Sequence, residues 1–385
     1  MTTEKTRVLL LFGGTSAEHE VSCRSAAFLF RHIDQQRFDL RASAVTRDGR
    51  WLPLKTEELL KDPPARLSAD ELSPSQTETI PLSSACQSPA DFIRIQAGYP
   101  AEHQGWHQNL VVFPLIHGSG GEDGSLQGFL DLAGVPYVGS GTTGSAVAMD
   151  KHMAKVLVAA EGIRVSPWIC LNDADWRSSS ATLTEDAVRR FGFPLFVKPA
   201  CLGSSVGISK VTSPEALLRA CELALTYDNK ILIEKAVSEP RELECAILGH
   251  GRADCTGPAE IIPTGDFYTY EAKYVSANGA ELRVEADIPP ELAGELRTLA
   301  LKIFRVLDLD GMARIDFLYS GKEQSCYFNE ANTIPGFTEI SQYPMLWKHA
   351  GLSEKELLSR LIDSALQRHK LRQRLTRNYK EGRTA

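Results

Sequence analysis

Apolar runs alternate with amphipathic stretches over most of the chain. The run RVLLLF at residues 7 to 12 is continuously apolar, and residues 21 to 33 then carry apolar side chains at helical spacing. A continuous apolar run is typical of a parallel strand covered on both faces, whereas a spacing of three to four residues is typical of a helix packed on a sheet. The same order returns in LVVFPLIHG at 110 to 118 and in the helical pattern at 124 to 134. We therefore predict an open parallel sheet with helices for residues 1 to 147.

Two further units follow. Residues 148 to 238 contain the short apolar runs PWICL, PLFVKPA and ILIEKAV between helical stretches, and a single helix predicted over 144 to 162 leads into them. Residues 239 to 369 show strand patterns around one long helical pattern at 289 to 307. Both units are predicted to be α+β. The basic, polar residues 370 to 385 are expected to be frayed.

The stretch from 52 to 105 departs from these patterns. It is polar, rich in Pro and Ser, and weakly periodic. Long stretches of this kind are usually surface loops. We interpret it as a surface insertion in the first unit.

The composition is that of a globular protein with several domains. The 385 residues are 43% hydrophobic and 24% charged, and the net charge is −7. A negative chain has no general attraction for nucleic acid or for an anionic membrane, and the apolar runs stay short of the roughly 18 residues that a spanning helix needs. The eight cysteines include no CxxC pair, which favours reduced thiols over a zinc site or a disulfide framework. We expect a cytoplasmic protein with no nucleic-acid or membrane partner.

A glycine-serine segment is the first candidate for chemistry. In KPACLGSSVGISK, Lys198 ends an apolar run, and the glycines at 203 and 207 allow backbone N–H groups to converge on an anion. Ser204 and Ser205 add hydroxyl donors. The alternative is a tight turn of small residues, and the segment alone does not decide between the two. It does not match GxxxxGK[ST], so a P-loop is excluded.

Lysines recur beside apolar residues elsewhere in the chain. They are Lys151, Lys235 and Lys273. Lysines from separate elements can together neutralise a triphosphate, although any single lysine at a strand edge is usually just solvated. They become candidates for phosphate binding only as a group.

The strongest chemical signal is RIDFLYSGKEQSCYFNEANTIPG, which reads as two strands joined by a short turn. Alternation places Arg314 and Asp316 on one face of the first strand, and Glu330 and Asn332 on one face of the second. Pairing the strands gathers three oxygen ligands, a set that suits Mg²⁺ shared with phosphate and does not suit zinc. The alternative is a salt-bridged strand pair without a metal. An acid in an otherwise apolar strand is costly unless a cation compensates it, which favours the metal site.

The first unit carries two further candidates. Gly13 and Gly14 follow the first strand, but the GxGxxG spacing of a dinucleotide fold is absent. Glu18 is interpreted as an acid able to receive an ammonium group, or else as a charge at a helix start. His117 ends a buried strand, where open α/β sheets bind ligands, unless it is a structural histidine.

These segments together resemble one family. LFGGTSAEHEVS, HGSGGEDGSLQGFLDLAGVPYVGSG, AMDKHMAK, FVKPACLGSSVG, RELECAILG, FYTYEAKY, MARIDF and FNEANTIPGFTEIS occur in the order of the D-alanine:D-alanine ligase family, over roughly residues 7 to 368. The resemblance implies an α/β protein with the ATP-grasp fold, in which an N-terminal open parallel-sheet domain precedes two α+β domains that clamp the nucleotide. An NAD-dependent oxidoreductase is disfavoured by the missing GxGxxG. A regulator that has lost catalysis is disfavoured because the magnesium ligands and the arginine are all present.

The resemblance implies a site for ATP and two Mg²⁺ ions, or Mn²⁺ in their place. The residues that match ATP contacts are Lys151, Lys198, Ser205, Glu234, Lys235, Ala236, Val237, Glu242, Phe267, Lys273, Asn329 and Glu330. The metal ligands are matched by Asp316, Glu330 and Asn332. Lids are expected in FYTYEAKY and in the glycine-serine loop.

For the amino acids, Glu18 matches the residue that receives the ammonium of the first D-alanine, and His117 lies near its carboxylate. Ser204 is expected to tie the loop to Tyr274. Arg314 and the Gly336 amide match the donors for the oxyanion. The second D-alanine is expected near Ser341 and Gln342.

The implied reaction joins two D-alanine molecules with ATP through a D-alanyl phosphate, to supply a peptidoglycan precursor, in a homodimer. Tyr274 in EAKY resembles the dipeptide-forming branch of the family. Glu339 and Gln342 depart from the family pattern beside Ser341, so the pocket for the second substrate is where this chain is expected to differ. D-serine or another D-amino acid is the alternative second substrate.

Overall fold

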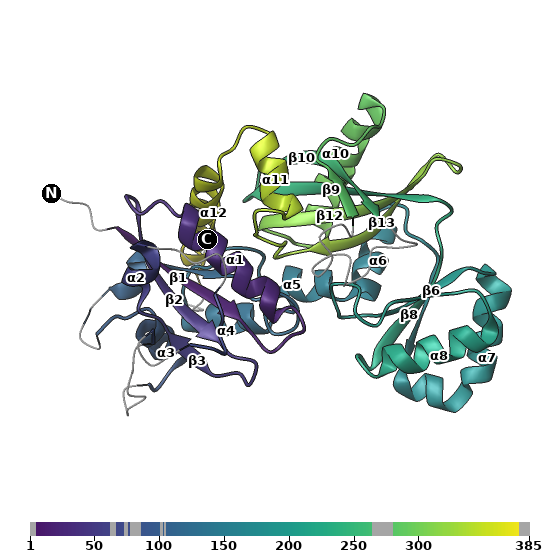
Figure 1. The fold of residues 1–385 in the computed structure, drawn as a ribbon, viewed down its shortest axis with the longest axis horizontal. Helices are drawn as coiled ribbons and strands as arrows, with labels where there is room; N and C mark the ends of the chain where they lie inside the picture. The colour runs from purple at the N-terminus through teal and green to yellow at the C-terminus, as the bar shows by residue number, and fades with distance from the viewer. Residues whose placement is uncertain are drawn as a thin grey trace, which may run out of the picture.

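The fold combines three sheets with helices between and around them (Figure 1). The computed structural model describes residues 5–61, 67–72, 76–77, 86–100, 103, 105–263 and 280–376. In these residues no helix is both long and apolar enough to cross a membrane.

The first sheet has the order β3-β2-β1-β4. Its strands are β1 (Thr6–Gly13), β2 (Phe38–Val45), β3 (Trp51–Pro53) and β4 (Leu110–Pro114). β1 is central and pairs in parallel with β2 and β4, as the continuous apolar runs predicted, whereas the short edge strand β3 is antiparallel. The helices of this part of the chain are α1 (His19–His32), α2 (Thr56–Lys61), α3 (Pro89–Gln96), the 3₁₀ helix η1 (Trp106–Asn109) and α4 (Ser125–Ala133).

The stretch from 52 to 105 is more than a surface insertion. Ile93 and Ala97 are fully buried against β1 and β4, and Tyr99 packs in the same cluster. The prediction of an insertion that stays on the surface was therefore wrong for α3. A polar average over the whole stretch hid one short amphipathic helix whose apolar face completes the core.

The helix predicted over 144 to 162 is two helices, α5 (Thr142–Met149) and α6 (Lys151–Ala160). They are separated at Asp150, which has an extended backbone and accepts hydrogen bonds from the backbone N–H groups of His152 and Met153. An aspartate in this position caps a new helix, and helical periodicity alone does not reveal such a break. The break makes Lys151 the first residue of α6.

The second sheet is antiparallel with the order β5-β8-β6-β7. Its strands are β5 (Trp168–Asn172), β6 (Leu195–Pro199), β7 (Ser209–Val211) and β8 (Lys230–Lys235). Two helices, α7 (Asp173–Phe191) and α8 (Pro214–Leu225), pack on it (Figure 1). The glycine-serine segment joins β6 to β7.

The third sheet has the order β11-β10-β9-β12-β13. Its strands are β9 (Pro240–Gly249), β10 (Asp254–Pro263), β11 (Ala280–Arg283), β12 (Gly311–Ser320) and β13 (Ser325–Asn332). On β12, Ala313, Ile315 and Phe317 are buried in one cluster with α10 (Pro290–Val306) and α6. Arg314 and Asp316 therefore project from the opposite face, as strand alternation requires.

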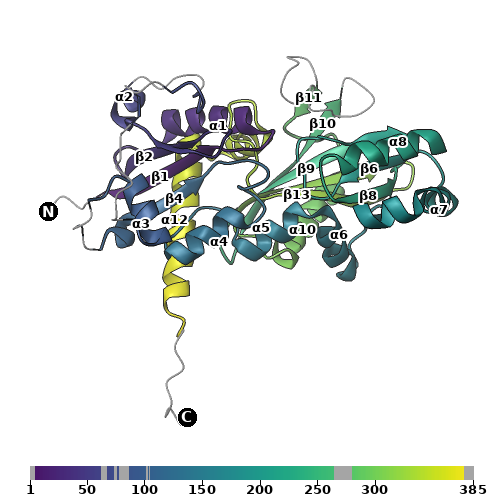
Figure 2. The ribbon, with the colours of Figure 1, turned by 90° about the horizontal axis from the view of Figure 1, so that it is seen from below.

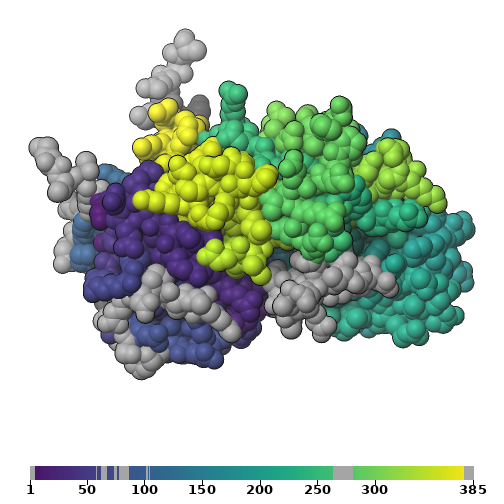
Figure 3. All heavy atoms as spheres, turned by 45° about the horizontal axis from the view of Figure 1, so that its top comes forward, coloured from purple at the N-terminus to yellow at the C-terminus, as the bar shows by residue number. Residues whose placement is uncertain are grey.

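The C-terminal helices α11 (Gln342–His349) and α12 (Glu354–Gln373) return to the first sheet. Leu358, Leu361 and Ile362 of α12 share one apolar cluster with β1, β4 and α1. Figure 2 shows α12 alongside the N-terminal elements, and Figure 3 shows the C-terminal residues in yellow lying over those in purple. α12 is helical as far as Gln373, so the prediction of fraying was wrong for residues 370 to 373, and residues 377 to 385 lie outside the described residues.

Candidate active site

A cavity of about 710 Å³ lies between the second and third sheets. Its walls include residues from β6, β8, β9, β12 and β13. The members that the sequence had singled out are Lys198, Ser205, Glu234, Lys235, Ala236, Val237, Glu242, Arg314, Asp316, Asn329 and Glu330. Residues that are up to 132 positions apart therefore meet at one cavity.

β12 and β13 pair as the sequence predicted, and the structure gives their register. Asp316 lies opposite Glu330, and Arg314 lies opposite Asn332. Arg314 donates two hydrogen bonds to Asp316, at 2.8 Å from Nε to Oδ1 and 2.7 Å from Nη2 to Oδ2. Asn332 Nδ2 donates to Asp316 Oδ2 at 3.0 Å. The carboxylate of Asp316 is thus held by one residue from each strand.

A bulge explains why two consecutive residues of β13 both reach the cavity. The register shifts between Asp316 and Phe317, so that Glu330 and Phe328 have partners on β12 and Asn329 is the extra residue. A bulge redirects a side chain that alternation would otherwise send to the far face. Asn329 Oδ1 accepts a hydrogen bond from Lys198 Nζ at 3.2 Å.

Glu244 is a site residue that the sequence reasoning missed. It lies opposite Asp316 on β9, is buried, and its Oε2 is 3.4 Å from Arg314 Nε. Burial alone would lower the pKa of Arg314, but the Asp316 and Glu244 carboxylates raise it well above its usual value. The signal was present in RELECAILG, where Glu242 and Glu244 alternate with apolar residues on one strand.

Lys198 is held at the cavity wall by Glu234. The distance from Lys198 Nζ to Glu234 Oε2 is 2.8 Å, and the carboxylate is almost fully buried. A second lysine, Lys155, binds the other oxygen of Glu234 at 2.8 Å. The sequence reasoning did not select Lys155, although it lies four residues after Lys151 on the same face of a helix.

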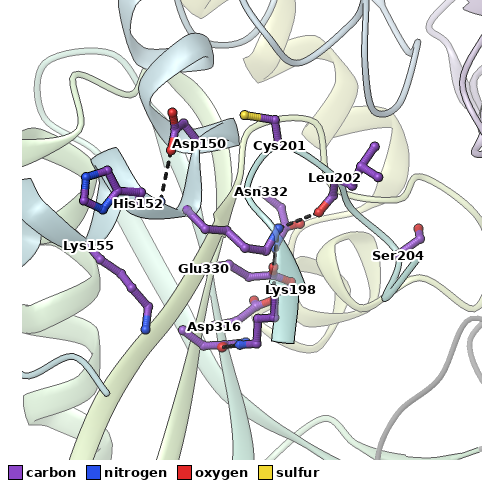
Figure 4. Close-up of polar contacts among 12 residues, drawn as sticks. Asp150, His152, Lys155, Lys198, Cys201, Leu202, Ser204, Asp316, Glu330 and Asn332 are labelled. Carbon is purple, nitrogen blue, oxygen red and sulfur yellow. Dashed lines mark hydrogen bonds and ion pairs between the residues drawn. The ribbon is translucent and has the colours of Figure 1, made fainter. Parts of the chain in front are cut away.

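Lys151 approaches the same site from the start of α6. Its ammonium donates to the carbonyl oxygen of Leu202, at 2.5 Å, and lies 3.6 Å from Glu330 Oε2. The backbone N–H of Lys151 also donates to Ala200 O at 3.0 Å. The helix start and the glycine-serine loop are therefore joined by a main-chain and a side-chain hydrogen bond, and Figure 4 shows the side-chain contact at Leu202.

The glycine-serine loop has left-handed backbone conformations at three positions. Ser204 and Ser205 have φ values of 53° and 59°, in the left-handed region that residues other than glycine rarely adopt. Gly207 follows at 71°. Strain of this kind persists where the surroundings hold it, and here the Ser204 hydroxyl donates a hydrogen bond to Glu18.

Glu18 and His117, the two residues expected to bind the first amino acid, lie near each other. The hydroxyl of Ser16 donates to His117 O at 2.7 Å, and His117 Nδ1 is 2.9 Å from Ile334 O. His117 Nε2 is 3.0 Å from the Ser25 hydroxyl. Burial lowers the pKa of His117, so a neutral ring is favoured. The ring is fully engaged, which supports a structural role beside any contact with substrate.

Glu122 is a third residue, after Glu244 and Lys155, that the sequence reasoning missed. Its two oxygens accept hydrogen bonds from the backbone N–H groups of Gly118 at 2.8 Å and Ile334 at 2.9 Å. Burial, and then the Glu18 carboxylate, raise the pKa of Glu122 to about 8, against the lowering effect of these two N–H groups. In the sequence it stands in a loop, GGEDGS, where an acid is ordinarily solvated.

The loop after β13 carries Gly336 and Ser341. The Ser341 hydroxyl accepts a hydrogen bond from Thr338 N at 3.0 Å, and a Cβ at Gly336 would come within 2.9 Å of that hydroxyl. Gln342 begins α11. Glu339 turns away to α1, where its Oε1 is 3.4 Å from Arg31 and 3.2 Å from His32. Its carboxylate is therefore engaged by α1.

Phe267, Lys273 and Tyr274 lie outside the described residues, so their expected contacts remain predictions. Among the described residues no group of three or more His, Cys, Asp or Glu side chains is arranged to hold a metal. The expected magnesium ligands are the carboxylates of Asp316 and Glu330 and the amide of Asn332. A group made only of His, Cys, Asp and Glu side chains cannot include this set, because one of its members is an asparagine.

Comparisons with known proteins cover nearly the whole chain. The family model for the N-terminus of D-ala D-ala ligase matches residues 7–140, and the model for its C-terminus matches residues 157–363. A D-alanine--D-alanine ligase from Bradyrhizobium sp. (strain ORS 278) is 43% identical over 374 residues, which cover 96% of this chain and 97% of the relative.

Solved structures of ligases also match this chain over nearly its whole length. The D-alanine-D-alanine ligase of Coxiella burnetii has a TM-score of 0.79 at 31% identity, covering 96% of this chain and 97% of that one. The VanG D-Ala:D-Ser ligase of Enterococcus faecalis has a TM-score of 0.78 at 32% identity, covering 94% of this chain and 100% of that one. These structural neighbours have the ATP-grasp fold. Two family models in sequence order and full-length relatives at about 40% identity lead to one conclusion: this chain belongs to the D-alanine–D-alanine ligase family.

Proposed function

We propose that the chain joins two D-alanine molecules to D-alanyl-D-alanine at the expense of ATP, forming ADP and phosphate and supplying a peptidoglycan precursor. One observation carries the proposal: Arg314, Asp316 and Glu330 face a single cavity whose opposite wall holds Lys198. Relatives that are about 40% identical over almost their full length carry the name D-alanine--D-alanine ligase. A cavity lined by both cationic side chains and carboxylates suits a nucleoside triphosphate with its metal.

ATP is expected to bind with its phosphates near Lys151, Lys198 and the loop that carries Ser205. The base is expected at the end of β8, where Glu234, Lys235, Ala236 and Val237 border the cavity, and the ribose near Glu242. Lysine ammonium groups neutralise phosphate charge without needing a defined geometry. Ser205 of the glycine-serine loop lines the same cavity.

The side chains of β12 and β13 fit Mg²⁺ or Mn²⁺. Asp316, Glu330 and Asn332 offer only oxygen ligands, and the Asp316 carboxylate is already oriented by Arg314 and Asn332. Hard divalent ions prefer such oxygens, and two ions are expected from the family pattern. When bound, the metal would neutralise charge on the transferring phosphoryl group.

Chemistry requires activation of the first D-alanine, because a carboxylate would otherwise have to expel oxide. Its ammonium is expected at Glu18, which orients the carboxylate toward the γ-phosphate. Phosphoryl transfer gives an acyl phosphate, and the amine of the second D-alanine, expected near Ser341 and Gln342, attacks the carbonyl carbon. Arg314 and the Gly336 N–H are the proposed donors to the oxyanion that forms. The carbonyl then re-forms as the C–O bond to phosphate breaks, and the nitrogen loses a proton to give the neutral peptide bond.

Water must be excluded because an acyl phosphate hydrolyses. The glycine-serine loop is the proposed lid, since it is held to α6 by Lys151 and to the first unit by Ser204 and Glu18. Tyr274 and Lys273 are proposed to complete it from the segment that follows β10. The chain is further proposed to act as a homodimer in the cytoplasm.

The direct test measures ADP and phosphate release with Mg²⁺ and ATP, with D-alanine as the sole amino acid, and identifies the dipeptide by mass spectrometry. We expect release to depend on D-alanine in a ratio of one ADP per dipeptide. Absence of turnover with D-alanine would refute the proposal.

A second candidate is a ligase that joins D-alanine to D-serine. It is favoured by the likeness to the VanG D-Ala:D-Ser ligase at 32% identity. The same assay with D-alanine and D-serine mixed decides between the two by the ratio of the dipeptide products. We expect D-alanyl-D-alanine to predominate.

A further inference from the structure

Lys155 lies beneath the cavity rather than on its wall. It belongs to α6, one turn after Lys151, and only 1% of its surface is exposed. Figure 4 shows it to one side of the group formed by Lys198, Asp316 and Glu330. A fully buried lysine is rare unless its charge is paired.

The ammonium group of Lys155 has a complete set of partners. It lies 2.8 Å from Glu234 Oε1, 2.7 Å from the Ser166 hydroxyl and 3.3 Å from Ser166 O. Three acceptors match the three N–H donors of a lysine ammonium. The Trp168 ring lies 5.4 Å from the nitrogen and adds a further favourable contact with a cation. The pocket is therefore built for the charged form, although burial lowers the pKa of this lysine to about 8.

Glu234 stands between two lysines. One oxygen contacts Lys155 and the other contacts Lys198, each at 2.8 Å. Burial opposes the charge on Glu234, but the two ammonium groups lower its pKa to about 2, so the carboxylate is ionised. Two ammonium groups and one carboxylate leave one net positive charge, and Lys198 is the member of the lysine pair that borders the cavity.

Without Lys155 the same carboxylate would face Lys198 alone. The two charges would cancel, and the cavity wall would present a neutral pair where a phosphate is to bind. Opposite charges attract strongly at this distance in a buried site, so Lys198 would also be drawn toward Glu234. A lysine that is paired in this way attracts a bound anion less strongly than a lysine whose charge is not cancelled.

We propose that Lys155 is a positioning residue for the nucleotide: it neutralises Glu234, so that Glu234 can orient Lys198 toward ATP without cancelling its charge. The inference rests on the proposed function, because it assumes that Lys198 binds a phosphate of ATP. It concerns a residue that does not itself reach the nucleotide. Its effect should appear in nucleotide affinity more than in the affinity for D-alanine.

The test compares three chains. Lys155→Met removes the charge and keeps the length of the side chain. The double variant Lys155→Met/Glu234→Gln also removes the carboxylate that would cancel Lys198. Lys302→Met is the matched control, since Lys302 pairs with Glu161 at the end of the same helix, 3.2 Å away and outside the cavity. The dissociation constant of Mg·ATP is measured by calorimetry without D-alanine, together with KM for ATP, KM for D-alanine and the melting temperature.

We expect Lys155→Met to weaken Mg·ATP binding at least about tenfold, with little change in KM for D-alanine. The double variant should recover part of the lost affinity, because Lys198 regains its free charge while Glu234, itself an expected ATP contact, is altered. Equal losses in the single and double variants, or unchanged affinity in Lys155→Met, would overturn the inference. If instead the unaltered chain failed to bind Mg·ATP, the proposed function itself would be refuted, so the two failures are distinguishable. The melting temperatures separate loss of affinity from loss of folded protein.

Discussion

The hydroxyl of Ser204 donates a hydrogen bond to the carboxylate of Glu18, across 186 positions of sequence. Ser204 belongs to the loop between β6 and β7, and Glu18 directly precedes α1. The bond connects the loop proposed to hold ATP with the acid proposed to receive the first D-alanine. It also fixes the direction of the Glu18 oxygens, and with it the place where a substrate ammonium would lie.

Replacing Ser204 by Ala should weaken binding of the first D-alanine. A hydrogen bond to a charged acceptor is worth about 1.5 to 3 kcal/mol, so KM for D-alanine should rise by at least about tenfold. Stability should change little, because the loop contributes few core contacts. Initial rates at varied D-alanine measure the effect, and Ser209→Ala on the adjoining strand β7 is the control. An unchanged KM would mean that the bond does not orient Glu18.

Replacing Arg314 by Met should reduce both catalysis and stability. Loss of an oxyanion donor typically lowers kcat by about 10² to 10³. Asp316 and Glu244 would remain buried and charged without their partner, which costs about 3 to 5 kcal/mol of unfolding free energy. Denaturant unfolding and single-turnover kinetics measure the two effects.

A double variant separates the two roles of Arg314. Adding Glu244→Gln to Arg314→Met should restore part of the stability and none of the kcat, since Gln removes one buried charge and supplies no oxyanion donor. Arg297→Met on α10 is the control, because Arg297 donates to Gly257 O on the far side of the sheet. Recovery of kcat in the double variant would contradict the assignment of Arg314.

Asp316→Asn should raise the Mg²⁺ concentration needed for half-maximal activity. The change removes one of the two carboxylates that are expected to hold the metal, and carboxylates bind Mg²⁺ better than amides do. Activity is measured over a Mg²⁺ series at saturating ATP, and EDTA should abolish it. The control is Asp308→Asn, just before β12, which should need the same Mg²⁺ concentration for half-maximal activity as the unaltered chain. A parallel shift in both variants would argue against a ligand role for Asp316.

The raised pKa of Glu122 predicts that the free energy of unfolding depends on pH. Its pKa is raised from 4.5 to about 8 in the folded chain, so the folded chain holds a proton that the unfolded chain has already lost. The stabilising contribution is fully present below pH 4.5 and is lost as the pH rises to about 8. Denaturant unfolding between about pH 5 and 8.5 should show this loss in the unaltered chain and not in Glu122→Gln. Equal slopes in the two chains would contradict the raised pKa.

Glu339→Ala should leave the choice of second substrate unchanged. The sequence suggested that Glu339 alters that pocket, but its carboxylate lies at Arg31 and His32 on α1. Exposed ion pairs are worth about 0 to 1 kcal/mol, so the loss of stability should also be small. The ratio of kcat/KM for D-alanine and D-serine as second substrate measures the choice. A marked change in that ratio would show that Glu339 does influence the pocket for the second substrate.

Local sequence pattern was enough to assign the faces of the strands β12 and β13. Because side chains alternate along a strand, Arg314, Asp316, Glu330 and Asn332 could be assigned to one surface from their spacing, and their paired register confirms it. The parallel core of the first sheet and the position of Lys198 at a strand end were also predicted. The alternation of side chains depends only on neighbouring residues, so it can be recognised from the sequence alone.

Tertiary structure decided which charges meet. Lys155, Glu122 and Glu244 look like ordinary helix, loop and strand residues in the sequence, and their roles appear only when distant segments are packed together. The break at Asp150 was likewise missed, because a capping aspartate interrupts the backbone while the apolar pattern continues. The cost of burying a charge depends on partners from elsewhere in the fold, and no local pattern records those partners.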